Sequence, residues 1–237
     1  MRPFVLSLAL ALLLSGAACR PSSRAGQSEA QATARSGQAP SADSHVKRES
    51  KRRIVFLGDS LTAGLGLAPH QSYPALLQRK LDERGYRYEA VNAGVSGDTS
   101  AGGLRRLDWS IEGDVQILVV ALGANDGLRG LAPHDLKANL TAILERATQR
   151  GITVILAGME APPNYGADYT RQFREVYRAL AKTHNLRFVP FMLQGVAGTA
   201  ALNQRDGIHP NAQGTQMVAD LIWTALEPML ARPAVSP

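Results

Sequence analysis

From about residue 51 onward, short continuous apolar runs alternate with longer segments in which apolar residues recur every three or four positions. The short runs predict buried strands, and the longer segments predict amphipathic helices. The predicted strands are Ile54–Leu57, Tyr88–Val91, Val115–Leu122, Thr153–Ala157 and Arg187–Val189. The predicted helices are Ser72–Arg84, Ser100–Leu107, Pro133–Arg150, Asp168–Thr183 and Asn211–Leu230. This alternation predicts an α/β fold, a three-layer α/β/α sandwich around a central parallel sheet of about five strands.

Residues with useful chemistry follow several of the predicted strands. Ser60, Gly94 and Asn125 each come just past a strand, as does the loop from Met159 to Tyr165. Parallel sheets bind ligands beyond the carboxyl ends of their strands. We therefore expect these four segments to meet at one edge of the sheet.

The N-terminus has the pattern of an export signal. Arg2 supplies a positive charge, residues 4–14 are almost entirely apolar, and residues 15–18 form a small-residue cleavage zone. The apolar run is too short for a typical transmembrane helix. We expect residues 1–19 to be a signal peptide, and the protein to be exported to the bacterial periplasm or cell envelope.

The only cysteine, Cys19, comes directly after the cleavage zone. Its position resembles that of the lipidated cysteine of bacterial lipoproteins, although Gly16 stands where that motif usually has Leu. Lipidation would tether the protein to a membrane, whereas ordinary signal cleavage would leave it soluble. The rest of the chain has no cysteine, which excludes disulfides and cysteine-ligated metals from the domain.

Residues 20–50 are rich in Ser, Ala, Gln and charged residues and have no apolar periodicity, so we expect a disordered linker ahead of a domain at 51–232. Residues 1–53 hold 9 Lys and Arg against 3 Asp and Glu, a net charge of +6. The remainder holds 17 of each and is neutral. A neutral domain lacks the basic surface of a nucleic-acid binder, so we expect no nucleic-acid partner.

Four segments supply the residue types of a serine hydrolase. Ser60 follows the first strand and is a candidate nucleophile, but a hydroxyl needs a base to activate it. Asp206 and His209 stand three residues apart ahead of the last helix, where one imidazole nitrogen can meet the carboxylate and the other Ser60. The N–H groups of Ser60 and Gly94 and the Asn125 amide are candidate donors to an oxyanion. This chemistry requires no metal and no cofactor.

Some of these residues allow other interpretations. Thr62 replaces the second glycine of the α/β-hydrolase elbow, and Pro69 stands where a nucleotide-binding loop needs its third glycine. Asp206 could merely precede a turn, with His209 capping a helix. Of the other histidines, His70 lies near Ser60 in sequence and is a candidate pocket residue, while His134 and His184 stand near helix ends and should face solvent. Asp126 is expected to brace its loop.

Four ordered blocks resemble those of the SGNH, or GDSL, hydrolases. They are Gly58–Leu61, Asn92–Thr99, Gly123–Asp126 and Asp206–Asn211, and the similarity runs from about residue 54 to 230. Asn125–Gly130 and Pro163–Gly166 add a likeness to the bacterial thioesterase I, arylesterase and lysophospholipase type. The resemblance implies a flavodoxin-like SGNH hydrolase fold.

The same resemblance implies roles for particular residues. Ser60 would be the nucleophile, His209 the base and Asp206 the residue that orients it. The oxyanion hole would consist of the Ser60 and Gly94 N–H groups and the Asn125 side chain. The implied activity is hydrolysis of carboxylic esters or thioesters through an acyl-enzyme.

The substrate is expected to be a small ester or a lysolipid. Leu128, Met159 and Tyr165 lie on loops at the predicted active edge and could line an acyl groove, or could instead pack those loops together. A carbohydrate O-acetyl esterase would use the same triad on acetyl groups. A non-catalytic tethered envelope protein would keep the fold without turnover.

Overall fold

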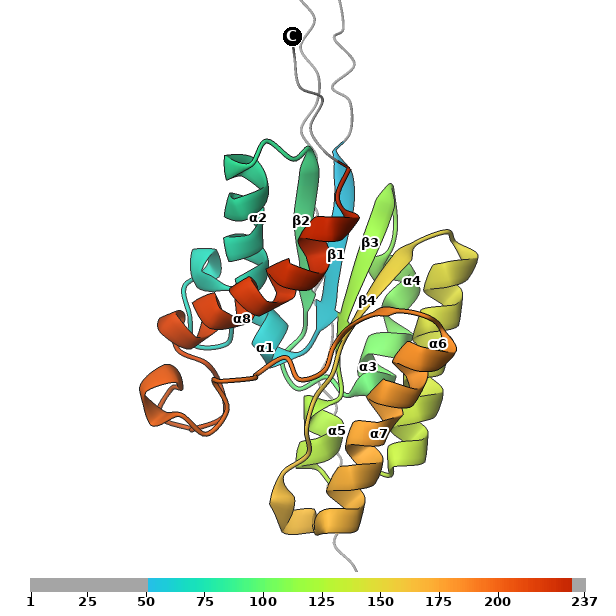
Figure 1. Cartoon of the computed structure of the whole chain (residues 1–237), viewed down its shortest axis with the longest axis vertical. Coiled ribbons are helices and arrows are strands. Elements are labelled where there is room, and N and C mark those ends of the chain that lie inside the picture. The colour runs from blue at the N-terminus through green and yellow to red at the C-terminus, as the bar shows by residue number, and fades with distance from the viewer. Residues whose placement is uncertain (1–50, 232–237) are drawn as a thin grey trace, which may run out of the picture. The chain divides into compact units, whose positions relative to one another are not determined.

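The computed structural model describes residues 51–231. The predicted signal peptide, Cys19 and the predicted linker lie outside the described residues, so they stay predictions. Figure 1 shows one sheet with helices on both sides. Within residues 51–231, no helix has the length and apolar character needed to cross a membrane.

The five strands form a single, entirely parallel sheet in the order β2-β1-β3-β4-β5. They are β1 (Arg52–Gly58), β2 (Tyr88–Gly94), β3 (Val115–Ala121), β4 (Thr153–Ala157) and β5 (Arg187–Val189). The order reverses beside β1, the first strand in sequence but second from the edge. Such a reversal opens a crevice at the carboxyl ends of the strands, where ligands bind.

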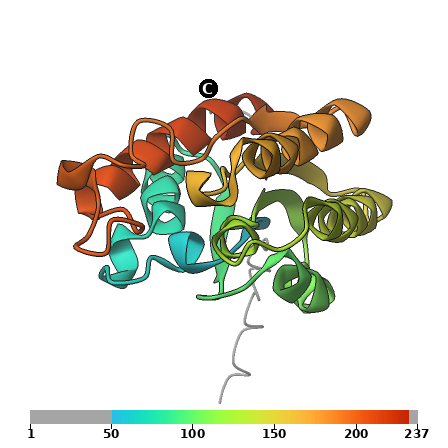
Figure 2. The same cartoon turned by 90° about the horizontal axis from the view of Figure 1, so that it is seen from below.

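Helices cover both faces of the sheet (Figures 1 and 2). The helices are α1 (Ser60–Ala63), α2 (Tyr73–Glu83), α3 (Ser100–Arg105), α4 (Leu107–Ser110), α5 (Ala124–Leu128), α6 (Pro133–Gln149), α7 (Ala167–Thr183) and α8 (Ala212–Leu226). The 3₁₀ turns are η1 (Pro69–Gln71), η2 (Pro163–Tyr165), η3 (Ala200–Leu202) and η4 (Glu227–Met229). Helices α2 and α8 pack together on one face, and α3, α6 and α7 pack side by side on the other. These layers confirm the predicted α/β/α sandwich.

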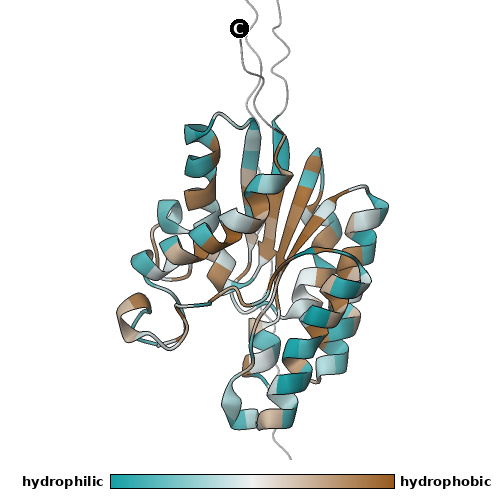
Figure 3. Ribbon diagram, viewed as in Figure 1, coloured by the Kyte–Doolittle hydropathy of each residue, from teal (hydrophilic) through white to brown (hydrophobic). Residues whose placement is uncertain are grey.

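The core lies between the sheet and its two helical layers, and the central strands are apolar along most of their length (Figure 3). Five consecutive residues of β1, from Ile54 to Gly58, are buried, as are the last five of β3. A parallel strand covered on both faces needs such a continuous apolar run, because neither face meets water.

The register of the sheet brings three strand ends to one level. Gly58, the last residue of β1, pairs with Gly94 of β2 on one side and with Ala121 of β3 on the other. The segments that leave these strands therefore begin next to one another, at the edge seen in Figure 2.

Two helices differ from the predicted boundaries. The helix predicted over Ser100–Leu107 breaks at Arg106 into α3 and α4. The last helix ends at Leu226 and continues only as a 3₁₀ turn, since Pro228 has no N–H to donate within an α-helix. It begins after Asn211, whose side-chain oxygen accepts hydrogen bonds from the N–H groups of Gln213 and Gly214.

Candidate active site

Ser60 opens the short helix α1 immediately after β1. The preceding residue, Asp59, caps this helix by accepting a hydrogen bond from the Leu61 N–H at 3.0 Å. Gly64 ends it in the left-handed region, with φ of 76°. The helix is thus held to a single turn, which presents the Ser60 hydroxyl at the carboxyl edge of the sheet.

His209 lies on the loop before α8, 149 residues further along the chain, and meets Ser60 across the edge of the sheet. The Ser60 Oγ lies 2.9 Å from the His209 Nε2. The other ring nitrogen, Nδ1, lies 2.7 Å from the Asp206 Oδ2. The three side chains therefore form a continuous hydroxyl–imidazole–carboxylate chain, the arrangement that activates a serine nucleophile.

Asp206 also organises its own turn. Its Oδ1 accepts hydrogen bonds from the N–H groups of Ile208 at 2.9 Å and His209 at 3.0 Å. The His209 N–H, then the Ile208 N–H, and then the His209 ring lower the pKa of Asp206 from its ordinary value of 3.8 to about 2. The carboxylate is therefore ionised at neutral pH, as needed to orient an imidazole.

Gln204 ties the base loop to the nucleophile loop. Its backbone N–H donates to the His209 carbonyl at 2.7 Å. Its side-chain Nε2 donates to the Leu65 carbonyl at 2.7 Å and to the Pro210 carbonyl at 3.0 Å. These bonds join segments that the sequence separates widely and so support the spacing between Ser60 and His209.

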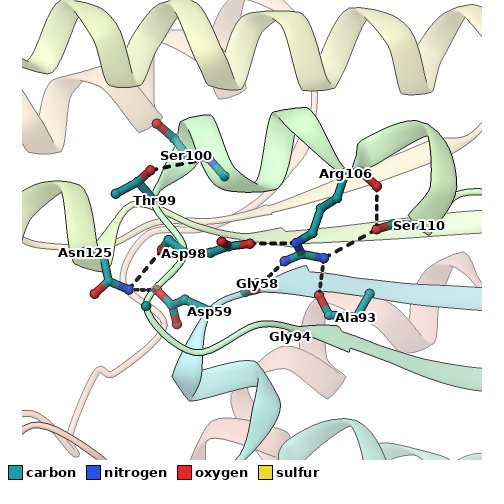
Figure 4. A network of polar contacts seen from close by, with 12 residues as sticks. Gly58, Asp59, Ala93, Gly94, Asp98, Thr99, Ser100, Arg106, Ser110 and Asn125 are labelled. Carbon is teal, nitrogen blue, oxygen red and sulfur yellow. Dashed lines mark hydrogen bonds and ion pairs between the residues drawn. The ribbon is translucent and has the colours of Figure 1, made fainter. Parts of the chain in front are cut away.

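Asn125 comes from the third strand end, in the first turn of α5. Its Nδ2 donates to the Asp98 carbonyl at 2.9 Å and makes a longer contact of 3.4 Å with the Asp59 Oδ2 (Figure 4). The next residue, Asp126, is buried and accepts hydrogen bonds from the N–H and hydroxyl of Ser100 at 2.7 and 2.6 Å. Asp126 thus fastens its loop to α3, the bracing contact that we expected of it.

The structure corrects the place of Gly94. This residue is still part of β2, and its N–H donates to the side-chain oxygen of Asn92 at 3.0 Å. A Cβ at Gly94 would collide with the backbone of Ala63, so its glycine serves the close packing of β2 against α1. Gly94 does not border the hollow beside Ser60.

Gly97, which sequence reasoning missed, does border that hollow together with Ser60, Asn125 and His209. It adopts φ of +85°, a conformation that favours glycine. The sequence offered one signal: Gly97 stands three residues beyond the strand end, in the same block as Gly94, where the backbone has left the sheet ladder and can face a ligand.

We call this depression the reactive hollow; it encloses about 260 Å³. Its walls are mainly apolar side chains, with Ser60, His209 and Asn125 as the reactive polar groups. The apolar wall residues are Leu61, Leu65, Ala124, Leu128, Pro162, Leu193 and Ile208. Within residues 51–231, no group of three or more His, Cys, Asp or Glu side chains could hold a metal ion.

Of the three predicted groove residues, only Leu128 lines the reactive hollow. Met159 is buried in the core, because the chain turns inward directly after β4. Tyr165 instead donates its hydroxyl to the Leu128 carbonyl at 2.9 Å, and its ring packs at a tilt against that of Tyr169. Met159 and Tyr165 thus follow the alternative, packing the loops rather than lining the groove.

The other three histidines between residues 51 and 231 lie apart from the reactive hollow. His70 borders a separate small hollow with Arg79 and Gln216. His134 is exposed beside Asp135, while His184 is half-buried at the end of α7, at the opposite edge of the sheet.

Comparison with known proteins decides the family. Residues 56–217 match the model of the GDSL-like Lipase/Acylhydrolase family. The chain belongs to this family. It is accordingly a carboxylic ester hydrolase of the GDSL, or SGNH, type with the SGNH hydrolase fold, as the sequence blocks implied.

Three relatives illustrate the likeness. Esterase TesA of Pseudomonas aeruginosa is 42% identical over 186 residues, covering 78% of this chain and 92% of the relative. Thioesterase 1/protease 1/lysophospholipase L1 of Escherichia coli K12 is 35% identical and covers 75% and 84%. A solved structure of the esterase EstA from Pseudoalteromonas, inhibited by monoethylphosphonate, is 32% identical, with a TM-score of 0.71 and coverage of 75% and 98%.

Proposed function

We propose that this GDSL hydrolase cleaves carboxylic esters and thioesters through an acyl-enzyme on Ser60. The observation that carries the proposal is the unbroken contact from the Ser60 hydroxyl through His209 to the ionised Asp206. Inhibition of the relative EstA by a phosphonate also supports it, since phosphonates react with activated serines.

In the first half-reaction, the Ser60 Oγ attacks the acyl carbonyl while His209 Nε2 takes the hydroxyl proton. His209 then gives this proton to the departing alcohol or thiol as its bond to the acyl carbon breaks. In the second half, His209 takes a proton from water as the water oxygen attacks the acyl-Ser60 carbonyl. His209 then returns this proton to the Ser60 Oγ as the bond between Oγ and the acyl carbon breaks and the acid leaves.

The oxyanion of each tetrahedral intermediate needs hydrogen-bond donors on the side opposite His209. We assign this role to the N–H groups of Ser60 and Gly97 and to the Asn125 amide. Asn125 keeps its 2.9 Å bond to Asp98, while a substrate oxygen replaces its longer contact to Asp59.

The apolar walls of the reactive hollow support acyl chains or aryl groups as the bound part of the substrate. The lysophospholipase name of the E. coli relative supports lysolipids within this class. The export signal and Cys19 in the sequence support action at the cell envelope, where cytosolic acyl-CoA is absent.

The test is a series of p-nitrophenyl esters from acetate to palmitate, with lysophosphatidylcholine as a further substrate. We expect turnover that favours medium or long chains and that falls by about 10⁴- to 10⁶-fold in Ser60→Ala. His209→Ala should match it, and the double variant should lose little more.

Three results would point elsewhere. Wild-type rates in Ser60→Ala would disprove the nucleophile assignment. Activity confined to acetate would favour a carbohydrate O-acetyl esterase, and no turnover together with no phosphonate labelling would favour a binding protein.

A further inference from the structure

Arg106 lies where the chain breaks between α3 and α4, and Figure 4 shows Asp98 between it and Asn125. Its side chain is only 16% exposed, and it donates hydrogen bonds to three segments of the chain. The Nε reaches the Asp98 Oδ2 at 2.6 Å, Nη1 reaches the Ala93 carbonyl at 2.7 Å, and Nη2 reaches the Gly58 carbonyl at 2.7 Å.

Two of these acceptors lie at the strand ends that position the site. Gly58 is the last residue of β1, two residues before Ser60, and Ala93 is the penultimate residue of β2. The Gly58 carbonyl also accepts the Val95 N–H at 3.0 Å. A single planar guanidinium therefore joins the end of the nucleophile strand to the segment that leads toward Gly97.

The third acceptor, Asp98, is held through both its side chain and its backbone. Its carboxylate is fixed by Arg106, while its backbone carbonyl accepts the Asn125 Nδ2 at 2.9 Å. Gly97 precedes Asp98 directly in the chain. A displacement of the Asp98 backbone would therefore disturb both the Asn125 amide, which donates to the Asp98 carbonyl, and the neighbouring Gly97.

The local sequence makes room for this contact. A Cβ at Gly102 would collide with the Asp98 carboxylate, so glycine at this position lets α3 approach it closely. Asp98 and Arg106 are 17% and 16% exposed, so their charge-assisted hydrogen bond is shielded from most of the solvent. Such a bond restricts orientation more than a surface ion pair does.

We propose that Asp98 and Arg106 form a positioning pair for the oxyanion side of the site. The pair holds the Gly97 N–H and the Asn125 amide where the negative oxygen develops, and neither side chain touches the substrate itself. The proposal rests on the acyl-enzyme function proposed above. A misplacement of about 1 Å in such donors can cost roughly 10²-fold in rate.

Two substitutions test the pair. Arg106→Lys keeps the positive charge, but lysine can reach only some of the three acceptors. Asp98→Asn keeps the shape of the side chain and the backbone carbonyl but removes the negative charge. We expect kcat to fall by about 10- to 100-fold in Arg106→Lys, and less in Asp98→Asn, with KM changed by less than about threefold. The loss falls on kcat because the donors act mainly on the transition state.

Arg150→Lys is the matched control. Arg150 donates to Asp108 at 2.8 Å, but the two side chains are 44% and 60% exposed and lie away from the reactive hollow. Its kcat and KM should match the wild type. Thermal unfolding of each variant identifies any that is not folded at the assay temperature, in which case Asp98→Asn carries the test.

A double-mutant cycle with Asn125→Ala separates positioning from general stabilisation. If Arg106 acts through the oxyanion donors, Arg106→Lys should cost clearly less in the Asn125→Ala background than in the wild type. Additive losses, or an unchanged kcat in folded Arg106→Lys and Asp98→Asn, would overturn the proposal. Turnover in Ser60→Ala would instead overturn the acyl-enzyme function, so the two failures are distinguishable.

Discussion

The oxyanion side of the reactive hollow is built into the protein interior, whereas the base side is a surface loop. On the first side, Asp59 and Asp126 are both buried. Asp59 caps α1 and contacts Asn125 of α5, and Asp126 binds the N–H and hydroxyl of Ser100 in α3. On the second, the side chain of Asp206 is 44% exposed and finds its partners within its own turn, at Ile208 and His209. One side is held by tertiary contacts and the other mainly by local ones.

The two sides shift the pKa of a carboxylate in opposite directions. Burial is the largest influence on Asp59 and raises its pKa from 3.8 to about 6. Hydrogen bonds, led by the His209 N–H, lower the pKa of Asp206 to about 2. Two aspartates on opposite sides of the same nucleophile thus differ by several powers of ten in proton affinity, because desolvation opposes the charged form and hydrogen bonding favours it.

The largest effect on the base side is expected from Asp206→Asn. The amide cannot stabilise the imidazolium and favours the wrong tautomer of His209, so kcat should fall by about 10⁴-fold. Ester hydrolysis in a stopped assay checks this, and Asp108→Asn on the surface is a control that should retain full activity. A loss of less than about tenfold would mean that Asp206 does not orient the base.

The same residue should govern acid stability. Its pKa is lowered in the folded state, so its contribution is present above the unfolded value of 3.8 and is lost as pH falls toward about 2. Asp206→Asn should therefore lose less stability than the wild type between about pH 4 and about pH 2, as measured by thermal unfolding.

On the oxyanion side, Asn125→Ala is expected to reduce kcat by about 10²- to 10³-fold. This loss is smaller than that expected for Asp206→Asn, because two backbone donors would remain. KM should change little, because the amide acts mainly on the transition state. An unchanged kcat in folded Asn125→Ala would show that Asn125 is not an oxyanion donor.

Sequence patterns predicted the strands and strand ends that position the site, but not every residue that lines the reactive hollow. The five strands follow from continuous apolar runs, and strand ends in a parallel sheet meet at one edge, so the approach of Asn125 to Ser60 was predictable. The Ser60–His209 contact was expected from the chemistry of the two side chains and from the resemblance of the sequence blocks to the SGNH hydrolases. The single-turn helices α1 and α5 were missed, because four or five residues are too few to display a helical period.

The misplaced residues share one cause. The position of Gly97 rather than Gly94 beside the reactive hollow, and the burial of Met159, depend on how a loop turns after its strand ends. That path is set by contacts such as Arg106 with Asp98, which join positions without a fixed spacing. Leu128 was placed correctly because α5 follows its strand directly.

Asp59→Asn is expected to have the smallest effect on activity. It should have the largest effect on how stability depends on pH. The raised pKa means that the folded protein binds the Asp59 proton more tightly than the unfolded chain does, so stability should fall as pH rises from about 4 to about 6 and then level off. The difference between 3.8 and about 6 corresponds to about 3 kcal/mol. Asparagine carries no such proton, so Asp59→Asn should not lose stability in this way. Its melting temperature relative to the wild type should therefore rise by about 6–12 °C between about pH 4 and about pH 6.

Asp114→Asn, on an exposed loop before β3, is the control and should show no such trend. The amide introduced by Asp59→Asn would face the Asn125 amide, so kcat is expected to fall by less than in Asn125→Ala while the stability gain persists. Asp59→Asn should thus gain stability relative to the wild type as pH rises, whereas Asp206→Asn should gain it as pH falls. If both variants gained in the same direction, burial would not be what distinguishes the two carboxylates, and the contrast between the two sides of the hollow would fail.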